Sequence, residues 1–171
     1  MPPLAGRPIR LRVLPALHAC GGRLRSGGSH GEEVHAASFL RRREIVLDAA
    51  LLDRAGELAR ILAHELSHFV WLRAGNALRN SWGRLLAAEL ERGVRGELGW
   101  SAEQRKGRLT ARDARDGTLR WREYACESFC DSAAWLFSGL RRHSEFTLAK
   151  RHCAVRRAWL RSAFSKPEIS I

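Results

Sequence analysis

The stretch from His64 to His68, which reads His-Glu-Leu-Ser-His, constrains the chain most, because its histidines can act together only on a helix. Residues four apart share one helical face, with Cβ atoms about 5–6 Å apart, so both imidazoles can reach one metal ion. Apolar residues recur at helical spacing through the same segment, at Leu58, Leu62, Leu66 and Phe69. The sequence therefore predicts a helix from about Asp53 to Arg73.

This pattern predicts a hydrolytic zinc site. Imidazole is a preferred zinc ligand, and Glu65 lies beside the two histidines without being needed as a ligand. In such sites the ion polarises a carbonyl and acidifies a bound water, while a free carboxylate takes the proton of that water. We therefore predict that His64 and His68 bind one Zn²⁺ per chain and that Glu65 is the catalytic base.

A third ligand must come from elsewhere, because a catalytic zinc usually has three protein ligands and an open fourth position. The segment from Trp121 to Asp131 gathers metal-capable side chains on one helical face. They are Glu123, Cys126, Glu127 and Cys130, with Asp131 near the margin. When a helical glutamate precedes another acid by four residues, the first can bind zinc while the second orients a ligand histidine through its other ring nitrogen.

Together the two segments resemble the gluzincins, zinc metallopeptidases whose second helix donates a glutamate as the third zinc ligand. The resemblance is greatest to compact members, the minimal gluzincins and the lethal-factor-like and repressor-cleaving regulatory peptidases. The second motif of these peptidases is matched, in order, by Glu123, Cys126, Glu127 and Phe129. The resemblance covers only these two short motifs, and it implies that Glu123 is the third ligand and that Glu127 contacts a ligand histidine.

A second alignment takes Glu127 and Asp131 as the glutamate and aspartate of the thermolysin-type motif, which has the same spacing of four. We favour Glu123, because Phe129 then lies on a core-facing stripe with Leu119 and Leu136. The alternative stays open, since a shift of the helical register would reverse the choice.

Cysteines are where the chain departs from the family pattern. Cys126 and Cys130 stand where family members usually carry small apolar residues, and a thiolate is a stronger zinc ligand than a carboxylate. We prefer the interpretation that both are small buried thiols packed against the active-site helix. Four scattered cysteines in a domain of this size predict reduced thiols, with no disulfide framework.

A residue after the second motif is a candidate for stabilising the transition state. The resemblance implies a downstream His or Tyr that donates a hydrogen bond to the tetrahedral oxyanion. His143 fits this role, and it equally fits a histidine near the last carbonyls of the preceding helix. Tyr124 is a poorer candidate, because it belongs to the ligand helix.

The overall pattern predicts one α+β domain over residues 1–171, with a short antiparallel sheet of about three strands packed on a helical bundle. Strands are expected at 8–14, 33–40 and 44–48, within an N-terminal part of about 8–48. Helices are expected at 53–73, 78–92, 118–140 and 149–164, within a part of about 53–164. A glycine-rich loop is expected at 20–31, and a mobile connector or lid with a short helix near 102–108 is expected at 93–117. The resemblance implies that one edge strand aligns an extended substrate across the zinc.

The net charge of +12 and the pI near 11.1 raise the question of nucleic-acid binding. Arginine outnumbers lysine 27 to 3 and is spread along the whole chain, without a binding stripe or a known recognition fingerprint. We therefore expect a zinc metallopeptidase whose partner is a peptide or protein. The alternative is a basic nucleic-acid or protein binding module with a structural or vestigial zinc, closed by Cys126 or Cys130.

Location in the cell is predicted from the apolar segments. No run of 18 apolar residues occurs, which argues against a membrane span. The first residues are rich in proline and interrupted by Arg10 and Arg12, unlike a secretory signal. We therefore expect a cytoplasmic protein.

Overall fold

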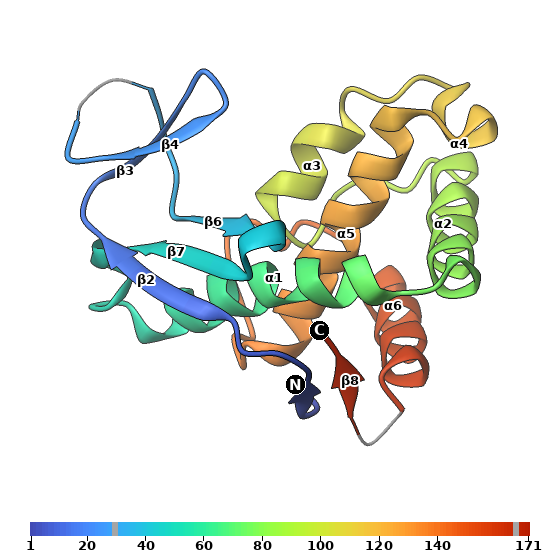
Figure 1. The fold of residues 1–171 in the computed structure, drawn as a ribbon. Helices are drawn as coiled ribbons and strands as arrows, with labels where there is room; N and C mark the ends of the chain where they lie inside the picture. Colours follow the sequence, from blue (N-terminus) through green and yellow to red (C-terminus); the bar gives the residue numbers. More distant parts are fainter. Residues whose placement is uncertain (29–30, 166–167) are drawn as a thin grey trace.

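The computed structural model of the chain describes residues 1–28, 31–165 and 168–171 (Figure 1). Its strands are β1 (Leu4–Ala5), β2 (Arg10–Leu14), β3 (Leu17–Cys20), β4 (Arg23–Ser26), β5 (Glu32–Glu33), β6 (Ala36–Phe39), β7 (Glu44–Asp48) and β8 (Ile169–Ser170). Its α-helices are α1 (Ala55–Arg73), α2 (Asn76–Glu91), α3 (Trp100–Lys106), α4 (Asp113–Asp116), α5 (Leu119–Phe137) and α6 (Lys150–Ala163). Short strands thus precede a helical part, which confirms the predicted α+β class.

The central sheet has the strand order β2-β7-β6. The middle strand β7 is buried at all five positions and has the bounds predicted from the sequence. It pairs with β6 in antiparallel fashion, as expected of a hairpin, but with β2 in parallel fashion. The parallel pairing arises because the chain makes a long excursion through β3, β4 and β5 between β2 and β6. This order leaves β6 as an edge strand.

The excursion forms a second, antiparallel sheet in the order β4-β3-β5, which extends away from the helices (Figure 1). We predicted a loop over 20–31, but β4 lies inside that range, and part of the range, residues 29–30, lies outside the described residues. The turn between β3 and β4 is made by Gly21 and Gly22, both with positive φ. Two such residues form the tight turn that matches the twist of a hairpin, so the glycines favour the strand pair.

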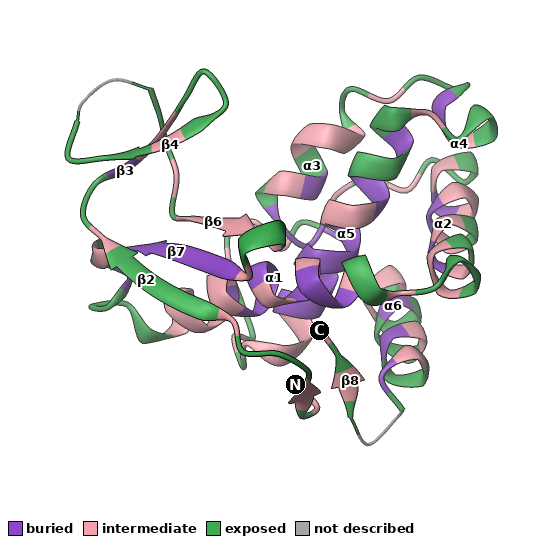
Figure 2. Ribbon diagram, in the orientation of Figure 1, coloured by how far each residue is buried: buried purple, intermediate pink, exposed green. Residues whose placement is uncertain are grey.

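Two apolar clusters hold the helices in place. One lies between the central sheet and α1 and contains Ile45, Leu47, Leu51 and Phe69. The larger one joins α2, α5 and α6, and includes Trp82, Leu86, Tyr124, Phe129 and Leu160. The buried faces of α1 and α5 meet at the centre of the molecule (Figure 2). Leu119, which we expected on a core-facing stripe, is 63% exposed.

A buried ionic network fixes the segment between α2 and α5. Arg156 of α6 is fully buried and donates to the carboxylates of Glu89 and Glu97, with its Nη2 2.6 Å from Glu89 Oε2. Glu97 also accepts from the Tyr124 hydroxyl at 2.6 Å and pairs with Lys106 Nζ at 3.1 Å. Residues 93–117 were expected to be a mobile connector or lid with a short helix near 102–108. They carry α3, which lies close to that expected helix, and α4, and both helices pack against α5.

The two ends of the chain meet in a small parallel sheet. Strand β1 pairs with β8, with Leu4 opposite Ile169 and Ala5 opposite Ser170. Among the residues that the structure describes, no helix has the length and apolar character needed to cross a membrane.

Candidate metal centre

Helices α1 and α5 cross so that His64, His68 and Glu127 face one point. The Nε2 atoms of the two histidines are 3.2 Å apart, and Glu127 Oε2 lies 3.3 Å from His64 Nε2 and 3.9 Å from His68 Nε2. A tetrahedral zinc with Zn–N and Zn–O of about 2.0–2.2 Å separates its ligand atoms by about 3.3–3.5 Å. Two of the three distances are close to this edge length, and the third is a few tenths of an ångström longer. The three groups therefore fit one zinc ion.

Asp131 contacts the side of the His64 ring that faces away from Glu127. Its Oδ1 lies 2.7 Å from His64 Nδ1, one helical turn after Glu127 on α5. When a metal ion binds, the hydrogen bond at Nδ1 keeps a proton on that nitrogen and leaves the lone pair of Nε2 available to the ion. The other carboxylate oxygen, Oδ2, accepts from the backbone N–H of Ala102 at 2.8 Å, so α3 anchors Asp131 in turn.

Gly99, immediately before α3, packs directly on the Asp131 carboxylate. Its φ is −179°, an extended conformation that any residue adopts, but a Cβ at this position would overlap the carboxylate. We expect Gly99→Ala to lower the free energy of unfolding by about 1–3 kcal/mol, the usual cost of forcing extra atoms into a packed site. Thermal or denaturant unfolding measures this effect.

Gly107, at the other end of α3, provides the matched control. A Cβ there would lie 3.7 Å from its nearest neighbours, which is ordinary van der Waals contact. Gly107→Ala should therefore leave stability almost unchanged. Equal stability of both variants would show that the contact between Gly99 and Asp131 is not as tight as described.

Glu127 is held in its ionised form. Burial disfavours its charge, but the hydrogen bond from His64 and the charges of His68, His64 and Arg105 outweigh that cost and lower its pKa to about 2. Arg105 of α3 contributes through its Nη2, which lies 3.4 Å from Glu127 Oε1. The pKa of His64 is raised, because the charge and hydrogen bond of Asp131 and the contact with Glu127 outweigh the effect of its burial. The carboxylates of Glu65, Glu127 and Asp131 thus lie around the two histidines, an arrangement suited to a cation.

Glu65 lies on the cleft side of α1, next to the edge strand. Its carboxylate is buried and accepts a hydrogen bond from the hydroxyl of Ser38 on β6. The contact fixes the carboxylate between the sheet and the histidine pair. Glu65 makes no ion pair among the described residues, so it is available to accept a proton.

A cleft runs past these groups between β6 and α3. It consists of two adjoining cavities of about 320 and 390 Å³, both lined by His64 and Glu65. The segment before β6 forms one wall, and Trp100 and Ser101 of α3 form the other. Although the chain is strongly basic, this cleft has many carboxylates in its lining. They are Glu32, Glu33, Glu65, Glu127, Asp131 and Glu145.

Glu123, the third ligand we favoured, does not lie in this site. Its side chain is exposed, and the group of possible ligands around the two histidines contains Glu127 instead. The choice rested on a core-facing stripe through Leu119, Phe129 and Leu136. Phe129 is buried and Leu136 packs against the core, but Leu119 is exposed, and Glu123 follows Leu119 one turn later. The geometry therefore matches the competing alignment, in which Glu127 and Asp131 are the paired acids.

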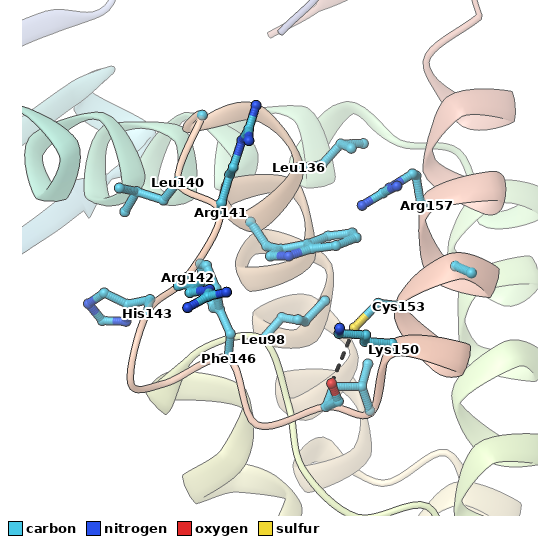
Figure 3. A pocket seen from close by; sticks show the side chains of 14 residues that line it. Leu98, Leu136, Leu140, Arg141, Arg142, His143, Phe146, Lys150, Cys153 and Arg157 are labelled. Carbon is cyan, nitrogen blue, oxygen red and sulfur yellow. Dashed lines mark hydrogen bonds between the residues drawn. The ribbon is translucent and has the colours of Figure 1, made fainter.

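His143 is also outside the site. Its Nε2 lies 3.2 Å from Glu57 Oε2, and its Nδ1 accepts from the backbone N–H of Glu145 at 3.3 Å. Glu57 precedes His64 by about two helical turns, or about 10 Å along α1. His143 lines a different cavity of about 720 Å³, at the left edge of Figure 3. Since α5 ends at Phe137, neither predicted role, oxyanion donor or helix-end contact, matches this position.

Several cleft residues were not predicted from the sequence. Arg105 and Ser38 contact the central carboxylates, and Arg60 pairs with Glu145 at 3.0 Å across the end of the cleft. In the sequence these positions carry no signal, because serines and arginines of the same appearance occur throughout the chain.

Comparisons of this chain with models of protein families, with curated proteins and with solved structures found no match.

Proposed function

We propose that the chain is a zinc-dependent metallopeptidase in which His64, His68 and Glu127 hold the ion. The observation that carries the proposal is the near-tetrahedral spacing of these three groups beside the free carboxylate of Glu65, at the floor of a cleft. When bound, the zinc acidifies a water molecule and polarises the scissile carbonyl. We further propose a cytoplasmic location, with which four free cysteines are consistent.

In this proposal, Glu65 acts as general base and then as general acid. It takes a proton from the attacking water and passes it to the leaving amine. Ser38 orients the carboxylate through its hydrogen bond, and Asp131 keeps His64 in the tautomer that presents Nε2 to the ion. The hydrogen bond from His64 and the charges of His68, His64 and Arg105 keep Glu127 ionised.

A peptide is the substrate that suits the cleft. The free edge of β6 runs along it, and an extended peptide can pair with such an edge through main-chain hydrogen bonds. This geometry recognises the backbone and makes few demands on side chains, so it supports a peptide in preference to a small amide.

The alternative of a binding module with a closed zinc site has less support. Closure would need a fourth protein ligand on the same ion, and Cys126 and Cys130 were the predicted donors. Both sulfur atoms lie near His68 Nδ1, on the opposite side of the ring from the Nε2 that faces Glu127. They do not approach the point where His64 and Glu127 meet.

The proposed ligand set is tested by Glu127→Ala, with Glu123→Ala as the matched control on the same helix. The first variant should bind zinc more than about 100-fold more weakly, since even loss of a group that only supports a ligand costs about 10–100-fold. Glu123→Ala should bind zinc like the original chain, because its side chain is exposed. Zinc per chain and competition with a chromogenic chelator measure both, in chains that also carry Cys126→Ser and Cys130→Ser so that the sulfur atoms near His68 cannot bind the ion.

Retention of full zinc affinity by Glu127→Ala would contradict the proposed ligand set. The absence of zinc binding by the unmodified chain would contradict the proposed function itself.

A further inference from the structure

His68 contacts a second set of metal-capable atoms. Its Nε2 faces His64 and Glu127, whereas its Nδ1 lies 3.4 Å from Cys130 Sγ and 3.6 Å from Cys126 Sγ. The Nδ1 atom and the two sulfur atoms all lie within 4.8 Å of one another. The two nitrogens of an imidazole point away from each other, so these three atoms surround a different point in space from the one in the cleft.

The distances are those of ligands around one ion. With Zn–S of about 2.3 Å and Zn–N of about 2.0–2.1 Å, tetrahedral coordination separates sulfur from nitrogen by about 3.5 Å. Both observed distances fall within a tenth of an ångström of this value. A hydrogen bond from Nδ1–H would account for one close sulfur, but one N–H does not require a second sulfur at the same distance.

The chemistry of the donors selects the kind of ion. Two thiolates and an imidazole favour thiophilic ions over hard ions such as Mg²⁺ or Ca²⁺. Cys130 is buried and Cys126 is partly buried, so the sulfurs are also shielded from bulk water.

We propose that His68 Nδ1, Cys126 and Cys130 form a second metal site, for a thiophilic ion such as Zn²⁺, Cd²⁺ or Cu⁺. On binding, the ion takes the place of the Nδ1 proton, and this proton and those of both thiols pass to solvent. The site does not require that the chain cleave peptides, but it shares His68 with the proposed zinc site. The affinity for an ion at either site therefore depends on occupancy of the other, and the dependence is reciprocal.

Titration of the metal-free, reduced chain with Co²⁺ tests the proposal, because cobalt replaces zinc and its thiolate complexes show a charge-transfer band in the near ultraviolet. We expect two Co²⁺ per chain, one of which produces this band. His64→Gln removes a ligand of the cleft site only, and it should bind one Co²⁺ with the band intact. Cys126→Ser combined with Cys130→Ser should bind one Co²⁺ without the band.

The other two cysteines provide the matched control. Cys20 is exposed, and Cys153 donates to the Leu148 carbonyl, so Cys20→Ser combined with Cys153→Ser should leave the band unchanged. If the double change at the buried pair prevents folding, Cys126→Ser alone at the less buried position should still lower the band by about half, because one of two thiolates is lost.

Three results would overturn the inference. They are cobalt binding without a thiolate band, a band that persists without Cys126 and Cys130, and a band that disappears in His64→Gln, which would mean that one ion uses all the donors. A single Co²⁺ with a thiolate band that His64→Gln leaves unchanged would support the second site while contradicting the proposed zinc site in the cleft.

Discussion

Under the proposed mechanism, Glu65→Gln should abolish most peptide hydrolysis and leave zinc binding unchanged. The amide has nearly the shape of the carboxylate but cannot take a proton from water, and loss of a general base typically lowers the rate about 10²–10⁴-fold. Zinc content should be unchanged, because Glu65 is not among the three grouped ligands. The rate of appearance of new peptide termini in unfolded protein substrates, followed by mass spectrometry, measures the effect.

Glu123→Gln is the control for this experiment, since it removes a carboxylate of the same type from an exposed position. It should cleave the same substrates at the original rate. Full activity in Glu65→Gln would show that another group activates the water. Equal losses in both variants would point to a general effect of charge.

Arg156→Met should destabilise the fold more than any substitution at the surface. The side chain is fully buried between Glu89 and Glu97, and removing it leaves Glu89 without a cation and Glu97 with only that of Lys106. Breaking a buried ion pair in this way typically lowers the free energy of unfolding by about 3–5 kcal/mol. Urea unfolding followed by circular dichroism measures the loss.

The neighbouring arginine separates this effect from a general loss of charge. Arg157 is exposed and stacks on Trp135, with its Cζ 4.8 Å from the ring centroid, so Arg157→Met should cost no more than about 1 kcal/mol. Combining Arg156→Met with Glu89→Gln and Glu97→Gln should recover part of the stability, because the unpaired charges are then absent. A loss that the combined variant does not reduce at all would mean that packing, and not charge, dominates at Arg156.

The sequence was a good guide where one local pattern determines an element. Strand β7 was predicted at its observed bounds, because three consecutive residues of strand type, Ile45, Val46 and Leu47, are followed by the turn that begins at Asp48. Helix α1 begins within two residues of the predicted Asp53 and ends at Arg73, as predicted. The helical spacing of His64 and His68 also requires that they share a face, and their Nε2 atoms are indeed adjacent.

The third ligand was harder to predict, because its identity depends on where two helices cross. Glu123, Glu127 and Asp131 succeed one another at intervals of four and lie on nearly the same face of α5. They differ by about 6 Å per step along the helix axis, so the point of contact with α1 decides which one meets the histidines. No local pattern encodes that point. It follows from packing partners of α5 far away in the sequence, such as Trp82 and Leu160.

The segment 93–117 was misjudged for a different reason. Its charged residues predicted a solvated connector, yet Glu97 is completely buried beside Arg156, and Leu98 is 1% exposed. A glutamate in a sequence does not show whether its partner is water or a distant arginine. The acids and bases of this chain therefore have to be paired in space before the order of a segment can be judged.

The contrast between the carboxylates of the cleft and the charge of the whole chain affects how a substrate would arrive. At distances beyond a Debye length of about 8–10 Å, a diffusing peptide meets the summed positive field of the molecule, which favours acidic sequences. Inside the cleft it meets Glu32 and Glu33, both exposed, which favour basic side chains. The long-range approach thus favours acidic peptides, whereas binding in the cleft favours basic side chains. Added salt weakens the long-range attraction more than the contacts inside the cleft. A peptide with an acidic end and a basic end satisfies both, and the two fields would orient it before it touches the strand.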